Sequence, residues 1–347
     1  MPTTESVTNN TILDQLFTKS PQSIRHFELA PLSFEMHFYG QFEEAFFCDA
    51  IAHLETEKPA AGALKIAIID QKTTNQNIPD ALRHWPSVDA YSGDMLEMPA
   101  PFFGNCNTNS YTITFINRET SQAAIWLSDA AELPTYERSF PLRQFFYFWF
   151  RNTSHVMVHA GALGFDLGGV LLAGKGGSGK STSTMACLDS TLQYAGDDFI
   201  LIETQQPFVH SLYNVAKLEE HNLANFPHLR QYVYNWESVP VDKAQLFLRQ
   251  FMPEKVIHGF PLKAILLPKF TGQVNTAHRP ASKAEAMKAL VPSSVWLLRS
   301  DTYQVEKISC LVRNLPCFWL ETGTDLAQIP AKIIKILETM KAETIVD

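Results

Sequence analysis

Apolar runs of strand length recur through the first third of the chain. Residues 34–38 alternate apolar and polar side chains, as a half-buried strand does, and residues 64–69 form a nearly continuous apolar run. Residues 111–116 and 123–127 are two further runs separated by a short polar segment, which is typical of a hairpin. The pattern predicts a β-sheet in this part of the chain.

Helix and loop signals surround these strands. Residues 41–54 place apolar side chains at helical spacing, whereas residues 70–104 are rich in Asn, Pro, Ser and Asp and are typical of loop. Residues 1–20 are mostly polar and are expected to be flexible. We therefore expect a flexible N-terminus over 1–20 and an α+β domain over 21–135.

The most apolar stretch of the chain, residues 142–150, follows this domain. It contains six aromatic side chains, and it is shorter than a membrane span. We interpret it as a buried helix or a domain interface, with an exposed aromatic binding surface as the alternative. Because Pro134 and Pro141 mark a boundary just before it, a second domain is expected over 140–347.

The second domain shows strand and helix signals in alternation. Residues 262–267 and 317–320 have the apolar composition of core strands. Ser282 and Glu285 have the spacing of a capping box that opens a helix through Leu290, and Pro330 begins a last helix. Residues 205–256 show no clear period, and we expect mostly helix and loop there, in a lid or substrate-binding region.

A glycine-rich motif lies near the middle of the chain. Residues 174–181 match G-x-x-x-x-G-K-[ST], with an apolar strand-like run before them (169–173) and a helix-compatible segment after them (182–188). Such a loop turns backbone N–H groups toward phosphates, the lysine reaches the β- and γ-phosphates, and the hydroxyl ligates Mg²⁺. The alternative is a glycine-rich turn without a ligand. The expected nucleotide-binding residues are Gly174, Lys175, Gly176, Gly177, Ser178, Gly179, Lys180, Ser181 and Thr182.

Two adjacent carboxylates follow the loop by one helix and one strand. Asp197 and Asp198 come after Gly196 and precede the apolar residues 199–202. In P-loop enzymes an acid at a neighbouring strand end holds Mg²⁺, and a second acid can accept a proton from an attacking hydroxyl. Because side chains alternate along an extended segment, the two carboxylates are expected to serve different roles. The alternative is a solvated turn.

The order of these motifs resembles a known family. His159, a strand, the P-loop, a helix, the Asp pair and a further strand follow one another as in HPr kinase/phosphorylase and, more closely, the HPr-kinase-related proteins of peptide-tailoring gene clusters, including lasso-peptide kinases. The resemblance is strong over 155–203 and weaker through 211–218 and 282–286. It implies an α/β fold with a P-loop catalytic domain of the type shared with PEP carboxykinases, beside the smaller α+β domain.

The resemblance also implies roles for individual residues. Asp197 would be the general base, Asp198 and Ser181 would hold Mg²⁺, and His159 would lie beside the phosphates. A lysine at the position of Lys217 belongs to the likeness and could contact phosphate, with a solvated surface lysine as the alternative. The glycine-rich signature loop used for HPr and for the reverse reaction is absent, which argues against HPr as the substrate.

Arg279 is a further candidate from the residues themselves. It precedes Pro280 near an expected helix start and could act as an arginine finger in cis, whereas the alternative is a surface arginine. His159, taken alone, could equally be a structurally satisfied histidine. Arg279 and Lys217 complete the predicted cofactor-binding set.

Composition limits the cellular compartment and the binding partners that we expect for this chain. The chain has a formal net charge of −8 and no Lys/Arg run, so nucleic acid is an unexpected partner. Five widely spaced cysteines without a C-x-x-C pair fit free thiols in a reducing cytoplasm, and neither a signal peptide nor a membrane-spanning run is evident. The oligomeric state stays open.

These observations favour one function over two others. The leading hypothesis is an ATP- and Mg²⁺-dependent kinase that phosphorylates a serine-type hydroxyl of a peptide or small protein. Tyr232, Tyr234 and Trp236 could grip an extended peptide, or could belong to the core. The first alternative is a P-loop ATPase or nucleotide-gated binding module, and the second is a small-molecule kinase.

Overall fold

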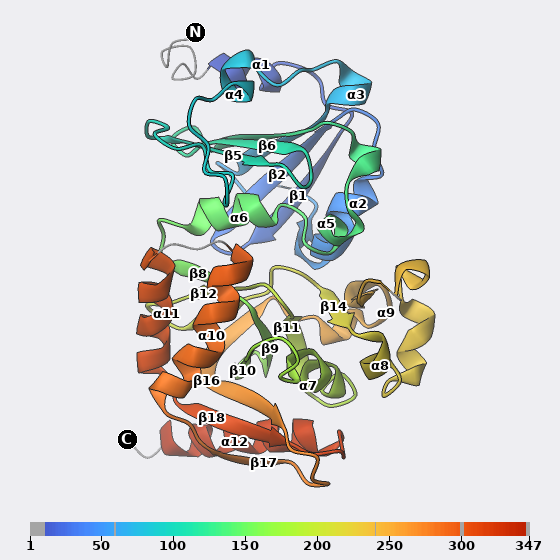
Figure 1. Ribbon diagram of the computed structural model, residues 1–347, viewed down its shortest axis with the longest axis vertical. Coiled ribbons are helices and arrows are strands. Elements are labelled where there is room, and N and C mark those ends of the chain that lie inside the picture. The colour runs from blue at the N-terminus through green and yellow to red at the C-terminus, as the bar shows by residue number, and fades with distance from the viewer. Residues whose placement is uncertain (1–10, 59, 240, 299–301, 345–347) are drawn as a thin grey trace. The chain divides into compact units, whose positions relative to one another are not determined.

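The chain divides into two compact units in a computed structural model that describes residues 11–58, 60–239, 241–298 and 302–344 (Figure 1). The first unit comprises Met1–Asp49 and Leu54–Trp149, and the second comprises Ala50–His53 and Phe150–Asp347. The division between Trp149 and Phe150 lies beyond the expected domain start at 140, because the aromatic helix there packs within the first unit.

The first unit contains a mixed sheet. Within the described residues the strand order is β3-β1-β2-β4-β7-β6-β5, in which β2–β4 and β4–β7 are parallel pairs and the rest are antiparallel. The strands predicted at 34–38 and 64–69 and the predicted hairpin are present. The strand bounds are β1 Ser23–Leu29, β2 Leu32–Tyr39, β3 Glu55–Thr56, β4 Leu64–Asp70, β5 Phe102–Asn107, β6 Thr112–Asn117 and β7 Gln122–Leu127.

Short helices accompany this sheet. The helix expected over 41–54 starts only at Glu44 and passes into a 3₁₀ turn, and a helix with Leu13 buried occupies part of the segment expected to be flexible. Residues 1–10 of that expectation lie outside the described residues. The helices are α1 Thr11–Phe17, α2 Glu44–Cys48, η2 Asp49–Leu54, α3 Gln71–Thr74, α4 Asp80–Arg83, η3 Ala130–Glu132, α5 Thr135–Ser139 and α6 Arg143–Phe150.

Helix α6 is the aromatic segment predicted to be buried. Phe145 and Phe146 are 1% and 0% exposed, and Phe146 contacts Phe34 on β2 edge to face. Because these rings fill the core of the first unit, the reading of this stretch as an exposed aromatic surface is wrong.

The second unit is built on a larger sheet. Within the described residues its order is β11-β9-β10-β16-β13-β12-β8, with β18 paired to β16 and β17 to β18. Strand β16 is parallel to both β10 and β18. The strand bounds are β8 His155–Val158, β9 Ala160–Phe165, β10 Gly168–Ala173, β11 Gln193–Gly196, β12 Ile200–Glu203, β13 Phe208–His210, β16 Gly259–Phe270, β17 Ala277–Pro280 and β18 Cys317–Thr322.

Helices cover both faces of this sheet. Alternate side chains of β10 enter different core clusters. Val170 and Leu172 pack with α7 (Lys180–Ala186), α12 (Gln328–Thr344) and a two-stranded ribbon formed by 215–218 and 244–247. Leu171 and Ala173 pack with α10 (Lys283–Leu298) and α11 (Thr302–Asn314). A strand buried on both faces needs the continuous apolar run that the sequence shows here. The helices are α7 Lys180–Ala186, α8 Glu220–Leu223, η4 Pro227–Tyr232, η5 Trp236–Ser238, α9 Leu248–Phe251, η6 Pro253–Lys255, α10 Lys283–Leu298, α11 Thr302–Asn314 and α12 Gln328–Thr344.

The segment 205–256 is mostly helix and loop, as expected, and it also contains short strands. Strand β13 joins the main sheet, and β14 (Val215–Leu218) pairs antiparallel with β15 (Ala244–Phe247) as a separate ribbon beside α7 (Figure 1). The strands are only three or four residues long, which is too short to show a period.

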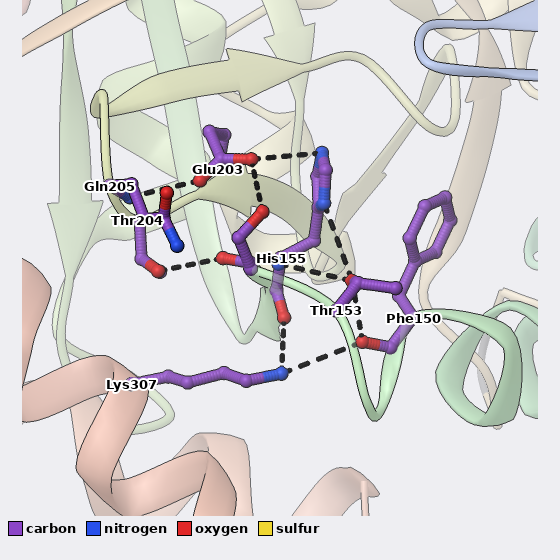
Figure 2. Close-up of polar contacts among 8 residues, drawn as sticks. Phe150, Thr153, His155, Glu203, Thr204, Gln205 and Lys307 are labelled. Atoms are coloured by element: carbon purple, nitrogen blue, oxygen red, sulfur yellow. Dashed lines mark hydrogen bonds and ion pairs between the residues drawn. The ribbon is translucent and has the colours of Figure 1, made fainter.

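Polar contacts fasten the start of the second unit to its sheet and to α11. Lys307 Nζ donates to the carbonyl oxygen of His155 at 2.8 Å and to that of Phe150 at 3.5 Å (Figure 2). It also donates to the carbonyl oxygen of Arg151 at 2.8 Å, and Ser154 Oγ donates to Glu203 Oε2 at 2.5 Å. Helix α10 starts with the predicted capping box: Ser282 N and Glu285 Oε2 are 2.8 Å apart, and Glu285 N and Ser282 Oγ are 3.2 Å apart.

Candidate functional site

The glycine-rich loop joins β10 to α7, so the strand and helix expected on either side of it are both present. Gly177 and Gly179 have φ angles of 75° and 96°, which side chains other than glycine rarely adopt. A Cβ added at Gly176, Gly177 or Gly179 would meet nothing within 4 Å. The loop therefore has open space along three glycines, as close approach of a phosphate requires.

Lys180, the first residue of α7, is folded back under this loop. Its side chain is buried, and Nζ donates to the carbonyl oxygen of Gly174 at 2.7 Å and to that of Lys175 at 3.4 Å. Burial lowers the pKa of Lys180, against the opposing influence of the carboxylates of Asp197 and Asp198. A buried ammonium group in contact with neutral carbonyls is well placed to receive an anion.

The two aspartates lie in a tight turn between β11 and β12. The N–H of Phe199 donates to the carbonyl oxygen of Asp197 at 3.0 Å, and Asp198 between them has a φ of 70°. A three-residue turn of this hand is rare and strained for a residue with a side chain. The turn, rather than strand alternation, separates the two carboxylates.

Asp197 is the more buried of the pair, at 1% exposed. The Ser181 hydroxyl lies close enough to influence its carboxylate, and both carboxylate oxygens lack a hydrogen-bond partner among the described residues. Burial and the neighbouring Asp198 raise the pKa of Asp197, while Ser181 and Lys180 oppose the rise. Gly161 on β9 leaves the necessary room, because a Cβ there would meet Thr184 Oγ1 at 2.6 Å and Asp197 Oδ1 at 3.5 Å.

Asp198 is paired instead with His159, which links β8 to β9. His159 Nε2 lies 3.0 Å from Asp198 Oδ1, and the His159 backbone N–H donates to Ser294 Oγ on α10 at 3.0 Å. Burial works to raise the pKa of Asp198, but His159, Lys217 and Lys243 outweigh it and lower that pKa. The structure thus places His159 directly beside Asp198.

The β14–β15 ribbon contributes cations to the same place. Lys217, a predicted site residue, lies on β14, half-buried and within electrostatic reach of Asp198. Lys243, just before β15, acts on both Asp198 and Lys180, and its Nζ lies 3.4 Å from Glu219 Oε1. Sequence reasoning missed Lys243, because it belongs to no motif and only the pairing of β14 with β15 brings it near Lys217.

Arg279 lies near a helix start, as expected, but it belongs to an edge strand. It lies on β17, shortly before α10 begins at Lys283, its Nε donates to Glu321 Oε1 at 3.0 Å, and its guanidinium lies 5.4 Å from the centre of the Trp319 ring. Among the described residues its recorded contacts are with β18 and not with the glycine-rich loop. Thr182 is half-buried in the first turn of α7, next to Ser181.

The residues present fit a Mg²⁺-bound nucleoside triphosphate. Lys180 offers a buried cation, the loop offers open glycine backbone, and Asp197 and Ser178 hold buried side-chain oxygens that lack a partner among the described residues. A buried carboxylate without a partner costs several kcal/mol, so additional positive charge beside the Asp pair is strongly favoured. Mg²⁺ is commonly held by one or two carboxylates together with phosphate oxygens.

Aromatic side chains near the ribbon are exposed. Tyr232, Tyr234 and Trp236 are 43%, 46% and 43% exposed. The Tyr232 ring stacks on Phe251 with centroids 4.1 Å apart, and Arg230 lies over the Trp236 ring. Because the backbone N–H of Tyr234 donates to Gln245 on β15, this exposed group is tied to the ribbon. The reading of these three rings as buried core is wrong.

Comparisons with known proteins complete the description. No protein-family model and no curated protein matches the chain. Among solved structures, the HPr(Ser) kinase/phosphatase from Coxiella burnetii is similar over 54% of this chain and 98% of its own, with 13% identity and a TM-score of 0.30. None of the described helices combines the length and apolar character needed to cross a membrane. A TM-score of 0.30 is too low to transfer a function, so the residues of the site itself have to carry one.

Proposed function

We propose that the protein is an ATP-dependent kinase that transfers the γ-phosphate to a serine-type hydroxyl of a peptide or small protein. One observation carries the proposal: the buried, partner-less carboxylate of Asp197 faces Ser181 beside a glycine-rich loop that encloses Lys180. This combination supplies a phosphate-binding loop, a cation and a proton acceptor within one site.

The loop and Lys180 would bind the triphosphate. Backbone N–H groups along 174–181 would approach the phosphate oxygens at the open glycines, and Lys180 would exchange its carbonyl contacts for β- and γ-phosphate oxygens. Ser181 and Asp198 would hold Mg²⁺, which when bound offsets the charge that develops on the phosphate oxygens. His159 would keep Asp198 oriented through the 3.0 Å contact.

Asp197 would accept the proton of the attacking hydroxyl. Its two oxygens lack partners among the described residues, whereas Asp198 already pairs with His159. A base with a free oxygen can approach an incoming hydroxyl without first breaking an interaction. Lys217 adds positive charge from the ribbon side, where it would stabilise the transferring group.

The acceptor would bind at the exposed aromatic group on the ribbon side. Tyr234 and Trp236 offer ring surface with polar edges, which suits contact with an extended polypeptide. The net charge of −8 favours a neutral or basic peptide over an acidic one.

Labelled ATP tests this proposal directly. We would incubate the protein with Mg²⁺, γ-labelled ATP and serine-containing peptides, including the product of any precursor gene beside its own, and would locate phosphate by mass spectrometry. Phosphoserine with little hydrolysis in the absence of peptide is the expected result. Rapid ATP hydrolysis that no peptide alters would instead identify a P-loop ATPase.

A further inference from the structure

The β14–β15 ribbon presents polar side chains on the face that carries Lys217. In the antiparallel ladder Lys217 pairs with Gln245, so their side chains lie on the same face, and Lys243 precedes Gln245 by two positions. Lys217 and Lys243 both lie within electrostatic reach of Asp198. The positive charge on this side of the ribbon therefore acts on Asp198.

Gln245 lies on the same face of the ribbon as Lys217. It is 1% exposed, and its Oε1 has no hydrogen-bond partner among the described residues. Its backbone, in contrast, is well held: the Gln245 N–H donates to Asn235 Oδ1 at 2.9 Å, and the Asn235 side-chain amide donates to the Lys243 carbonyl at 3.0 Å. An amide oxygen accepts hydrogen bonds and cannot pair with a phosphate oxygen, so Gln245 shows that this face of the ribbon is incompletely satisfied and leaves the phosphate contact to the lysines.

The side chain of Lys243 forms a weak, solvent-exposed ion pair with Glu219. Its partner Glu219 lies 3.4 Å away, and the two side chains are 42% and 51% exposed. An ion pair of that exposure contributes little to stability, so the Lys243 ammonium group can leave Glu219 at small cost. Its backbone is fixed by Asn235, so the motion is confined to the side chain.

We propose that the β14–β15 ribbon is a second phosphate-binding element, in which Lys243 leaves Glu219 and pairs with the terminal phosphate of a bound triphosphate. The inference rests on the proposed function, because the phosphate has to be presented by the glycine-rich loop. Lys180 would then hold the phosphate from the loop side and Lys243 from the ribbon side, with Glu219 as the counter-ion of Lys243 when no terminal phosphate is present.

A ligand comparison tests this inference. The probes are the non-hydrolysable β,γ-imido analogue of ATP and ADP, each titrated calorimetrically with Mg²⁺. Lys243→Met should weaken binding of the analogue about tenfold, the scale of one partly exposed charge-assisted hydrogen bond, and leave ADP binding unchanged. Lys243→Arg should keep most of the analogue affinity, and Glu219→Gln should equal or exceed the wild type.

The matched control is Lys335→Met, which removes an exposed lysine of α12 in the same unit and should change neither affinity. If Lys243→Met binds the analogue as the wild type does, or loses both ligands equally, the ribbon is not a terminal-phosphate site. If the wild type binds neither ligand, the proposed function itself fails, so the two failures are distinguishable.

Discussion

His159 Nε2 lies 3.0 Å from Asp198 Oδ1, and the backbone of Asp198 has a φ angle of 70°. In this turn the Asp198 carboxylate contacts His159, while the Asp197 carboxylate is buried with both oxygens lacking a partner among the described residues. A strained backbone conformation of this kind persists only where the surrounding contacts hold it in place, and such conformations are common at functional sites. Ser294 on α10, which accepts the His159 N–H, is part of those surroundings.

The two aspartates should respond differently to the same substitution. Asp197→Asn removes the proposed base, so transfer should slow by roughly 10²–10⁴-fold while nucleotide binding stays nearly intact. Asp198→Asn should instead raise the Mg²⁺ concentration needed for half-maximal rate. Initial rates across a Mg²⁺ series measure both effects. An altered Mg²⁺ dependence in Asp197→Asn alone would exchange the two roles, in keeping with the Ser181 hydroxyl that faces Asp197.

Asp197→Asn should also stabilise the ligand-free protein. The substitution removes a buried negative charge without a partner, and the expected gain in unfolding free energy is about 1–3 kcal/mol. Denaturant midpoints of the two proteins at neutral pH measure it. A lower midpoint for Asp197→Asn would mean that this carboxylate supports the fold rather than the chemistry.

Two glycines of the site allow binding to be separated from folding. Gly176→Ala adds a Cβ with nothing within 4 Å and at a φ outside the left-handed region, so stability should stay within about 0.5 kcal/mol of wild type. The same methyl group lies where a phosphate would approach, and triphosphate affinity should fall about tenfold. Unchanged affinity would place the phosphates elsewhere.

Gly161→Ala is the opposite case. Its Cβ would meet Thr184 Oγ1 at 2.6 Å, so the fold should lose about 1–3 kcal/mol. Thr184→Ala in the same chain removes the clashing atom and should recover part of that loss. Thermal unfolding of the two single variants and the double variant measures the coupling, and simple additivity would show that β9 and α7 are not in the close contact described.

Buried histidines should make the second unit sensitive to acid. Burial lowers the pKa of His53 to about 3 and that of His210 to about 4, and it also lowers the pKa of His155, which contacts Glu203 (Figure 2). Because the folded pKa lies below the ordinary value of 6.5, the stabilisation is fully present above that pH and is lost as the pH falls toward the folded value.

Denaturant unfolding between pH 7 and pH 5 measures this loss. Each buried neutral histidine should cost about 1.4 kcal/mol for every pH unit below its unfolded pKa. His53→Gln keeps a side chain that can pair with Ser211, whose Oγ lies 2.9 Å from His53 Nε2. This variant should lose less unfolding free energy per pH unit than the wild type, by the contribution of one histidine. A stability that does not change over this range would show that these rings are hydrated.

Features set by local sequence were predictable, and those set by long-range pairing were not. The strand and helix around 174–181 and the capping box at Ser282 depend on neighbours within a few residues, and both are present. Residues 41–54 were expected to form one helix, but 3₁₀ geometry takes over at Asp49. In the segment containing Lys217 and Lys243 the short strands were not predicted, because they find their partners only in three dimensions.

The candidate site likewise contains residues that local motifs predict and residues that only long-range pairing brings into place. The resemblance implied that His159, Lys180 and the Asp pair serve one phosphate site, and the structure places His159 in contact with Asp198 and Lys180 within electrostatic reach of both aspartates. Arg279 lies near the start of α10, as the capping signal at Ser282 indicates, but no local signal shows that 277–280 pairs with β18 as an edge strand. Lys243 carried no signal that a single sequence can show.

The central claim is that Lys180 and its loop bind a nucleoside triphosphate. Calorimetric titration of Mg²⁺-ATP into the wild type and into Lys180→Ala tests it most directly, with thermal unfolding of both proteins as the control for folding. We expect saturable binding to the wild type and a loss of at least about a hundredfold in the variant, since a buried charge-assisted contact is removed. Equal affinity in two equally folded proteins would contradict the claim.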